Sequence, residues 1–249
     1  MNGGKHAAIA FNDVSCSLGG RDVLKNLSFE VAPGESLCFL GRSGMGKSVT
    51  LKLLVGLLKP DKGEIYVENE NIVDMDEDAL SKVRRCMGFL FQSGALFDSM
   101  SLYDNLALPL GRLMEGKSNE EIRSIVQHNL DDVGLGKDGG KMPAELSGGM
   151  RKRAGLARAL MLQPRILLVD EPSSGLDRVT ESEIDGLLLR VRERDKTTML
   201  IVTHDIREAR RIGDRVAVLD KGSLVATGSL DELAENENAL VRALVSEAC

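Results

Sequence analysis

The chain has 249 residues, of which 43% are hydrophobic and 28% charged, and its formal net charge at pH 7 is -6. This composition predicts a globular protein with an ample buried core and excludes an intrinsically disordered chain. The mildly acidic balance argues against broad electrostatic attraction to nucleic acid or anionic lipid, so we expect no nucleic acid partner. Arg84-Arg85 and Arg151-Lys152-Arg153 form small basic spots, which we expect to be solvated faces.

The four cysteines are scattered and form no CxxC pair of the kind that binds zinc or carries redox chemistry, which indicates a reducing cytoplasm. They are Cys16, Cys38, Cys86 and Cys249. The first residues, MNGGKHAAIAF, lack the apolar core of a signal peptide. No apolar run approaches the roughly 18 residues that a membrane span needs. If the protein serves a membrane, we expect it to do so through partners.

The first third of the chain alternates β-rich stretches with turn residues. Residues 7–14, 23–31 and 64–67 are β-rich, and glycine-containing turns at 18–20 and 33–34 interrupt them. This pattern predicts an antiparallel sheet near the N-terminus.

A second pattern begins with the apolar run 37–40, which suits a strand buried on both faces and is followed by a glycine-rich turn and a helical stretch, 47–58. Similar runs occupy 166–169 and 199–202, and a strongly helical stretch occupies 151–162. Buried strands alternating with helices predict a parallel sheet. The expected fold class is therefore α/β, with an N-terminal antiparallel β subdomain.

The middle of the chain, 93–143, lacks such strands and is punctuated by Pro109 and glycines. Ser118 opens a helix with one apolar face that runs through 122, 125, 126, 130 and 133. We expect a single domain in which 1–92 and 144–228 form the catalytic core with its β subdomain. Residues 93–143 would form an inserted helical subdomain, and 229–249 a short helical C-terminal extension.

Residues 41–48 match G-x-x-x-x-G-K-[ST] between the buried strand and the helix that this motif requires. Backbone N–H groups of such a loop cradle phosphates, Lys47 reaches the β and γ phosphates, and Ser48 ligates Mg²⁺. The motif predicts that the α/β core is a P-loop NTPase (RecA-like) core, and the expected ligands are ATP and Mg²⁺. The candidate nucleotide-binding residues here are Gly41, Arg42, Ser43, Gly44, Met45, Gly46, Lys47, Ser48 and Val49.

The strand at 166–169 ends in two carboxylates, Asp170 and Glu171. Adjacent residues of a strand point different ways, so two roles are natural. Asp170 would hold Mg²⁺, and Glu171 would polarise the water that attacks the γ-phosphate. The alternative is a strand that simply ends in solvated acids.

Ser147, Gly148 and Gly149 precede the helical stretch 151–162 and so lie at a helix N-terminus, where anions bind. One chain needs only one triphosphate cradle, so a second implies that the γ-phosphate comes from another copy, in a homodimer. The alternative is an ordinary capped helix.

Leu146–Met150 resembles the signature motif of ABC ATPases, usually written LSGGQ, and further motifs follow the order of that family. Gln92 is similar to the Q-loop glutamine, residues 174–177 to the D-loop, and His204 to the switch histidine. The resemblance implies the ABC ATPase fold and ATP hydrolysis. It also implies that Gln92 senses Mg²⁺ and water and that His204 contacts the γ-phosphate.

Two positions depart from the family pattern. Leu18 stands where many members stack an aromatic residue on adenine, so base selectivity is expected to be loose. Met150 replaces the last glutamine of the signature, at the position least involved in phosphate contact. We expect activity to survive both changes.

Residues 91–105 and 145–153 resemble the Mla/Mce-type lipid-transport ATPases of bacteria. This resemblance implies a peripheral subunit on the cytoplasmic face of the bacterial inner membrane. Its partners would be a permease of the MlaE type and an MCE-type substrate-binding protein, and its cargo phospholipid or a related lipid.

An apolar run after Gln92 suits either the core or a groove for a short permease helix. Its residues are Ala95, Leu96, Phe97, Met100 and Leu102.

Three alternatives remain open. They are an ABC ATPase that serves a transporter of another substrate, a soluble non-transport ABC ATPase, and a P-loop kinase. The soluble ABC enzymes usually carry an insertion that does not fit between Lys47 and Ser147, and a kinase would leave residues 147–149 and His204 unexplained.

Overall fold

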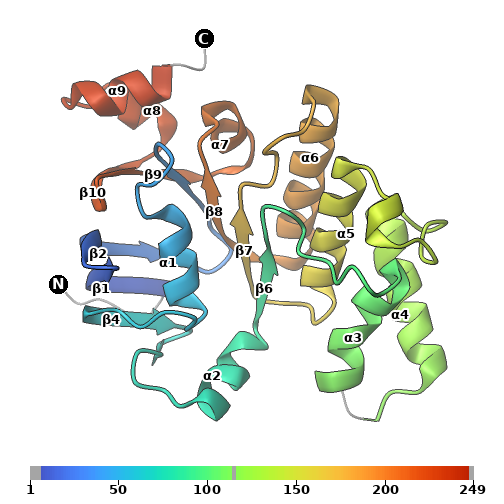
Figure 1. Ribbon diagram of the computed structural model, residues 1–249. Coiled ribbons are helices and arrows are strands. Elements are labelled where there is room, and N and C mark those ends of the chain that lie inside the picture. The colour runs from blue at the N-terminus through green and yellow to red at the C-terminus, as the bar shows by residue number, and fades with distance from the viewer. Residues whose placement is uncertain (1–6, 114–115, 247–249) are drawn as a thin grey trace.

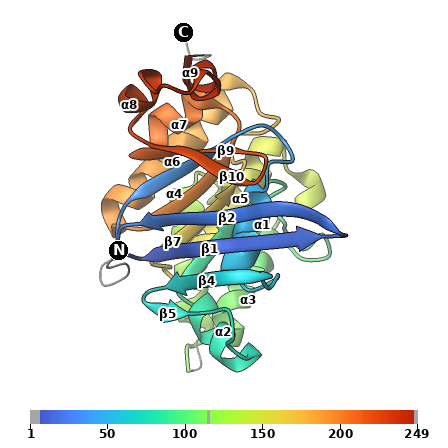
Figure 2. The ribbon, with the colours of Figure 1, turned by 90° about the vertical axis from the view of Figure 1, so that its left-hand side faces the viewer.

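The computed structural model describes residues 7–113 and 116–246, and these form two sheets flanked by helices (Figure 1). Cys249, the first six residues and the last three residues of the predicted C-terminal extension lie outside the described residues. Figure 2 shows the smaller sheet from the front, with the strands of the larger sheet crossing behind and above it.

The smaller sheet is antiparallel, in the order β2-β1-β4-β5. It consists of β1 (Ile9–Leu18), β2 (Arg21–Val31), β4 (Lys62–Val67) and β5 (Glu70–Asn71). Gly19 and Gly20 join β1 to β2 with φ values of 57° and 75°. Positive φ at both central residues is what a two-residue hairpin turn requires. The predicted N-terminal antiparallel sheet is confirmed.

The larger sheet has the order β10-β9-β3-β8-β7-β6 and is parallel except for β10 at one edge. Its strands are β3 (Ser36–Leu40), β6 (Met87–Leu90), β7 (Ile166–Asp170), β8 (Thr198–Thr203), β9 (Arg215–Asp220) and β10 (Ser223–Gly228). The three predicted buried strands are therefore confirmed as β3, β7 and β8. The other three strands were not predicted.

Nine α-helices and one short 3₁₀ helix, Pro143–Glu145, complete the described part of the chain. They are α1 (Lys47–Leu54), α2 (Glu77–Arg84), α3 (Leu102–Leu113), α4 (Asn119–Asp132), α5 (Gly148–Leu160), α6 (Arg178–Asp195), α7 (Ile206–Ile212), α8 (Leu230–Ala234) and α9 (Ala239–Ser246). Among these described helices, none is both long and apolar enough to cross a bilayer.

Helix boundaries differ from the sequence patterns where local chemistry intervenes. The helix predicted over 47–58 ends at Leu54, because the chain turns at Gly56, whose φ is 66°. Ser118 caps α4 with a capping box to Glu121, as predicted. Pro109 does not interrupt the middle segment but lies inside α3.

The larger sheet divides the core in two, because neighbouring strand residues face opposite sides. Leu37 and Phe39 of β3 pack with α1 and the smaller sheet, whereas Cys38 and Leu40 pack with the helices of the other face. β7 and β8 alternate in the same way. Burial on both faces explains why these strands are continuous apolar runs.

Asn105 of α3 is fully buried and fixes the loop before that helix. Its Nδ2 donates to the carbonyls of Phe97, Met100 and Ser101 at 3.0–3.1 Å, and its Oδ1 accepts from the Phe97 N–H at 2.7 Å. One side chain thus satisfies several backbone groups of residues 97–101.

Replacing Asn105 with leucine is expected to lower the free energy of unfolding by about 2 to 4 kcal/mol, because it leaves those backbone groups without partners. Urea denaturation of the two proteins measures the difference. Asn119→Leu, at an exposed position, is the matched control. Equal stability of the two variants would show that water replaces the asparagine at no cost.

Candidate functional site

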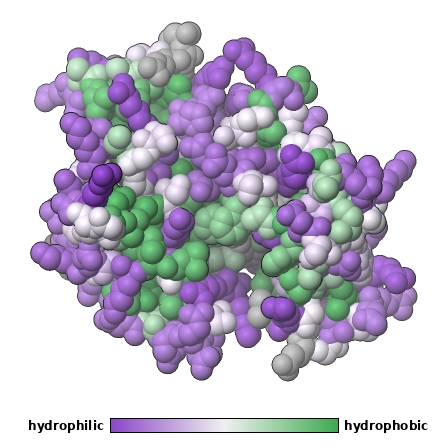
Figure 3. All heavy atoms as spheres, viewed as in Figure 1, coloured by the Kyte–Doolittle hydropathy of each residue, from purple (hydrophilic) through white to green (hydrophobic). Residues whose placement is uncertain are grey.

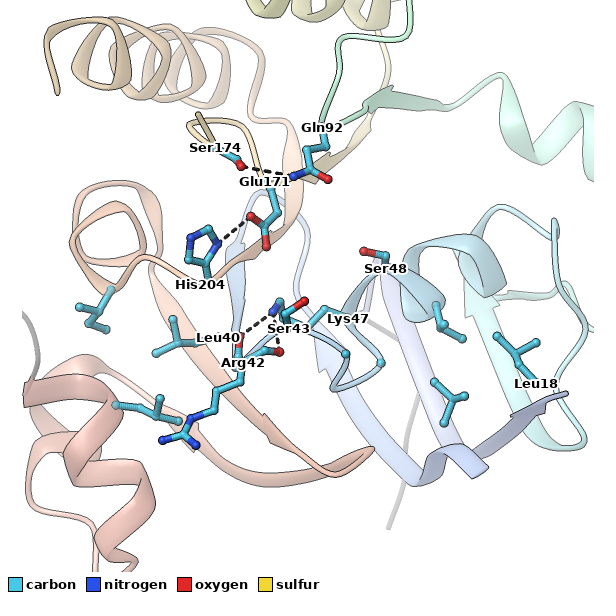
Figure 4. Close-up of a pocket in the computed structure, with 17 residues that line it drawn as sticks. Leu18, Leu40, Arg42, Ser43, Lys47, Ser48, Gln92, Glu171, Ser174 and His204 are labelled. Carbon is cyan, nitrogen blue, oxygen red and sulfur yellow. Dashed lines mark hydrogen bonds and ion pairs between the residues drawn. The ribbon is translucent and has the colours of Figure 1, made fainter. Parts of the chain in front are cut away.

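The main pocket of the protein opens at the carboxyl edge of the parallel sheet, where β3, β7 and β8 end (Figure 4). Ligands of open α/β sheets bind at this edge. The pocket has a volume of about 780 Å³. It is lined by Leu18, Val23, Leu40, Gly41, Arg42, Ser43, Gly44, Gly46, Lys47, Ser48, Val49, Gln92, Glu171, Ser174, His204, Ile206 and Leu244.

The loop between β3 and α1 forms the floor of the pocket, and close packing dictates its glycines. A Cβ on Gly41 would lie 2.6 Å from the carbonyl oxygen of Leu219 in the neighbouring strand. Gly46, the N-cap of α1, has a φ of 98°, which side chains rarely adopt. The loop therefore approaches β9 closely and delivers the N-terminus of α1 to the pocket, where the helix dipole favours anions.

Lys47 is 5% exposed and its ammonium group donates to the carbonyls of Gly41 and Arg42. Burial lowers the pKa of Lys47, and the nearby carboxylates of Glu171 and Asp170 oppose that shift. The lysine is thus held across its own loop, as the dashed lines in Figure 4 show. A triphosphate in the pocket would replace two carbonyl partners with charged oxygens.

Ser48 and Asp170 meet beside the pocket, where the Ser48 hydroxyl donates to Asp170 Oδ1 at 3.2 Å. Burial raises the pKa of Asp170, and the bond from Ser48 opposes this effect. A hydroxyl and a carboxylate in contact are oxygen ligands that suit Mg²⁺. No cluster of three or more His, Cys, Asp or Glu side chains suited to a metal occurs in the described ranges. The Ser48–Asp170 pair fits a magnesium ion that would take its other ligands from phosphate and water.

Glu171 and His204 face each other across the pocket, with 2.6 Å between Glu171 Oε2 and His204 Nδ1. Glu171 follows β7 in a left-handed backbone conformation with a φ of 48°, and its N–H donates to the Val202 carbonyl at 2.9 Å. Such a conformation is uncommon for a residue with a side chain and is often found at functional sites. The carboxylate and the imidazole are placed together as a pair.

Gln92 follows β6 and reaches the same region from the helical side. Its Nε2 donates to Ser174 Oγ at 3.3 Å, which links the segment after β6 to the segment after β7. Ser174 lines the pocket as well.

The far end of the pocket is aliphatic. Leu18 at the end of β1 is 40% exposed, and Val23 lies in β2. Figure 4 shows Leu18 on the opposite side of the loop from Glu171 and His204. Leu18 thus lines the pocket, and its relation to the adenine base stays a prediction.

Ser147, Gly148 and Gly149 do not line the pocket of their own chain. Ser147 caps α5 by accepting from the Met150 N–H at 3.2 Å, and both Ser147 and Gly148 are exposed. Gly149 is buried, and a Cβ there would lie 2.4 Å from Thr180 Cγ2. The turn is a capped, outward-facing helix N-terminus, and its second glycine is required by packing against α6.

Some pocket residues were missed in the sequence analysis. Leu40 and Ile206 belong to apolar patterns that indicate core, and Leu244 comes from α9 near the C-terminus. Lys152, which donates to the Glu171 carbonyl at 2.6 Å, was grouped with its arginine neighbours as a solvated basic spot but is 5% exposed. That interpretation of Lys152 is wrong, because the α5 helix turns this position inward.

The fold and the site together define a P-loop ATPase of the ATP-binding cassette class. The model of the family described as ABC transporter matches residues 24–174. The chain therefore belongs to the ABC transporter family.

Similar proteins cover most of this chain. The probable ribonucleotide transport ATP-binding protein mkl of Mycobacterium leprae is 43% identical over 94% of this chain. This chain spans about two thirds (67%) of the length of that relative. The intermembrane phospholipid transport system ATP-binding protein MlaF of Escherichia coli K12 is 38% identical over 94% of this chain and 87% of MlaF.

A solved structure has the same fold. It is the dimeric post-hydrolysis state of the ATP-binding cassette MJ0796 bound to ADP and Pi, with a TM-score of 0.83 and 35% sequence identity. The match covers 89% of this chain and 98% of MJ0796.

Lys47→Met is expected to weaken ATP binding at least about tenfold, since it removes a buried cation from the phosphate loop. Titration with a fluorescent ATP analogue measures the dissociation constant. Lys52→Met, on an exposed face of the same helix, is the control and should bind normally. Unchanged affinity in the Lys47 variant would show that the backbone of the loop alone holds the phosphates.

Proposed function

We propose that two copies of this chain sandwich two MgATP molecules, so that residues 147–149 of each copy close over the triphosphate in the other. One observation carries this proposal: the exposed helix N-terminus at Ser147 is built to receive an anion but lies outside its own chain's pocket. The dimeric state of MJ0796, a cassette of the same fold, supports it.

In the proposed site the phosphate loop and Lys47 hold the triphosphate, and Glu171 acts as the general base. Glu171 would accept the proton of the attacking water, while His204, in contact with its carboxylate, would contact the γ-phosphate. Gln92, hydrogen-bonded to Ser174, would orient the water from the opposite side. The buried position of Lys47 keeps competing water away from its charge.

Ser48 and Asp170, with Gln92, are the residues that would hold the magnesium ion. When bound, Mg²⁺ neutralises charge on the phosphate oxygens. The hydrogen bond between Ser48 and Asp170 holds both oxygen ligands in one place before any nucleotide arrives.

The cargo we propose is phospholipid or a related lipid, moved between bacterial membranes. MlaF is named for intermembrane phospholipid transport, and residues 91–105 and 145–153 resemble its family. The name of mkl favours ribonucleotide as a second candidate cargo.

An apolar groove supports a membrane permease as the partner. Leu57, Met87, Phe89 and Phe91 line a groove of about 280 Å³ with Val55 and Arg84, and Leu57 is 62% exposed. Phe89 and Phe91 stack with ring centroids 3.9 Å apart. Figure 3 shows hydrophobic surface gathered in the middle of this face of the molecule, over α1 and β6. Grooves of this kind receive an amphipathic helix.

The run of apolar residues at 95–102 divides between core and surface. Leu102 is fully buried and Leu96 packs against the core, whereas Phe97 is 50% exposed beneath the guanidinium of Arg158. Phe97 therefore remains a candidate contact for a permease helix, carried by residues 93–143 as the helical subdomain. The permease would be MlaE-like and work with an MCE-type protein, with this chain on the cytoplasmic face of the inner membrane.

Glu171→Gln is expected to keep ATP binding and lower turnover by about 10² or more, because the amide cannot accept the proton of the attacking water. The variant should also accumulate as a dimer with ATP, detectable by size exclusion with light scattering. Glu70→Gln at an exposed strand position is the control. Turnover at the normal rate would show that another group activates the water.

Leu57→Glu and Phe97→Glu are expected to abolish stimulation of ATP hydrolysis by the permease while leaving ATP affinity unchanged. A charge buried against an apolar helix costs several kcal/mol. The comparison is made with the ATPase co-purified and reconstituted with its membrane partner. Phe97→Leu, which keeps the surface apolar, should behave like the natural protein, and full stimulation in both glutamate variants would rule the groove out.

A further inference from the structure

A buried lysine connects α5, the helix that begins at the serine-glycine turn (residues 147–149), to the residue of the proposed catalytic carboxylate. Lys152 lies in the first turns of α5 and is 5% exposed. Its ammonium group donates to the backbone carbonyl of Glu171 at 2.6 Å. A hydrogen bond from a charged donor in a buried setting is stronger than one between neutral groups. The contact therefore holds the peptide on the C-terminal side of Glu171.

That peptide is where the chain leaves its regular strand. Glu171 has a φ of 48°, a conformation that costs a side-chain-bearing residue about 1 to 2 kcal/mol. Its N–H is fixed to the Val202 carbonyl and its carbonyl to Lys152. With both sides of the residue tied, the side chain is directed into the pocket toward His204.

A second buried carboxylate interacts electrostatically with the same lysine. Glu208 of α7 is fully buried, four residues after His204. Burial raises the pKa of Glu208 to about 7, and the negative charges of Asp185 and Asp205 add to the rise. The nearby hydroxyls of Thr203 and Ser173 oppose it. Within the described part of the chain, neither carboxylate oxygen has a hydrogen-bond partner in good geometry.

The positive charge of Lys152 compensates the negative charge of the nearby carboxylates. Burial lowers the pKa of Lys152, and Glu208, Glu171 and Asp170 oppose that shift. A buried cation among carboxylates has two separable roles, as the counter-charge to Glu208 and as the donor to the Glu171 carbonyl. The first role concerns stability and the second concerns the geometry of the reaction.

We propose that Lys152 is a positioning residue for ATP hydrolysis, because it holds the Glu171 backbone from α5 and so aims the carboxylate at the γ-phosphate. This inference rests on the role proposed for Glu171. The proposal gives α5 two functions. Its N-terminus would contact the nucleotide bound by the second copy, and Lys152 would position Glu171 in the site of its own chain.

Lys152→Met is expected to lower kcat by about 10- to 100-fold with little change in KM for MgATP, since a small misplacement of a catalytic group costs up to about 10²-fold. Lys152→Arg keeps a charged donor and is expected to retain most of the activity. Lys82→Met, at an exposed position of α2, is the control. Steady-state hydrolysis by the full chain measures both constants.

The double variant K152M/E208Q separates the two roles of the lysine. It removes the uncompensated buried carboxylate together with the lysine, so its urea midpoint is expected to return toward that of the natural protein while kcat stays low. Recovery of kcat together with stability would overturn the proposal, because Lys152 would then act only as a counter-charge. If Lys152→Met does not fold, the double variant carries the test.

Glu171→Gln in the same assay distinguishes this proposal from the one on which it rests. Normal turnover in Glu171→Gln would overturn the role of Glu171 itself. Slow turnover in Glu171→Gln, combined with recovery in K152M/E208Q, would overturn only the positioning role of Lys152.

Discussion

The whole site depends on the register of three parallel strands that are buried on both faces. Leu40 pairs with Thr203 and Asp170 with Val202, so the strands that carry the phosphate loop, the two acids and His204 end level with one another. A slip of one residue would move an acid by about 3.3 Å, more than the length of a hydrogen bond. The alternating packing of these strands into two cores is what prevents that slip.

Within this frame the site is an arrangement of buried charges that balance before substrate arrives. Burial lowers the pKa of Lys47 and of Lys152 and raises that of Asp170, and each of these shifts is opposed by a partner in the same cluster. Two cations held on backbone carbonyls beside two carboxylates create no isolated charge. The site is therefore organised around charge that the protein supplies itself, and a bound triphosphate would replace existing partners of these groups.

Sequence patterns predicted the parts of the molecule that local chemistry determines. The phosphate loop, the strand ending in Asp170 and the capping box of Ser118 each follow from a few adjacent residues. β6 and β10 were missed because their residues are largely half-buried, and β6 has only four residues. A strand of only a few residues has too short a hydrophobic pattern to be distinguished from a loop. β9 carries four consecutive buried residues, 216–219, in an apolar run like that of β3, and the prediction overlooked it.

Residues whose roles depend on tertiary contacts could not be predicted from the sequence, because their partners lie far away along the chain. Leu244 reaches the pocket from α9, about two hundred positions after the phosphate loop. Gly149 resembles a phosphate-binding glycine in sequence, yet its lack of a side chain is required by Thr180 of α6. Lys152 sits between two arginines and was assigned to the surface, since a charge run usually faces solvent.

The first two turns of α5 carry one exposed and one buried polar residue, and this arrangement would connect the two nucleotide sites of the proposed dimer. Ser147 is exposed at its N-cap, whereas Lys152, five residues further and so about 7.5 Å along the axis, is buried against Glu171. A hydrogen-bonded helix of this length moves as one body rather than bending between adjacent turns, because cores and packed elements deform little. In the proposed dimer, a displacement of Ser147 by the second copy would therefore be passed along α5 to the carbonyl of Glu171. The two sites would therefore be coupled over about one and a half turns of α5, and not over the width of the domain.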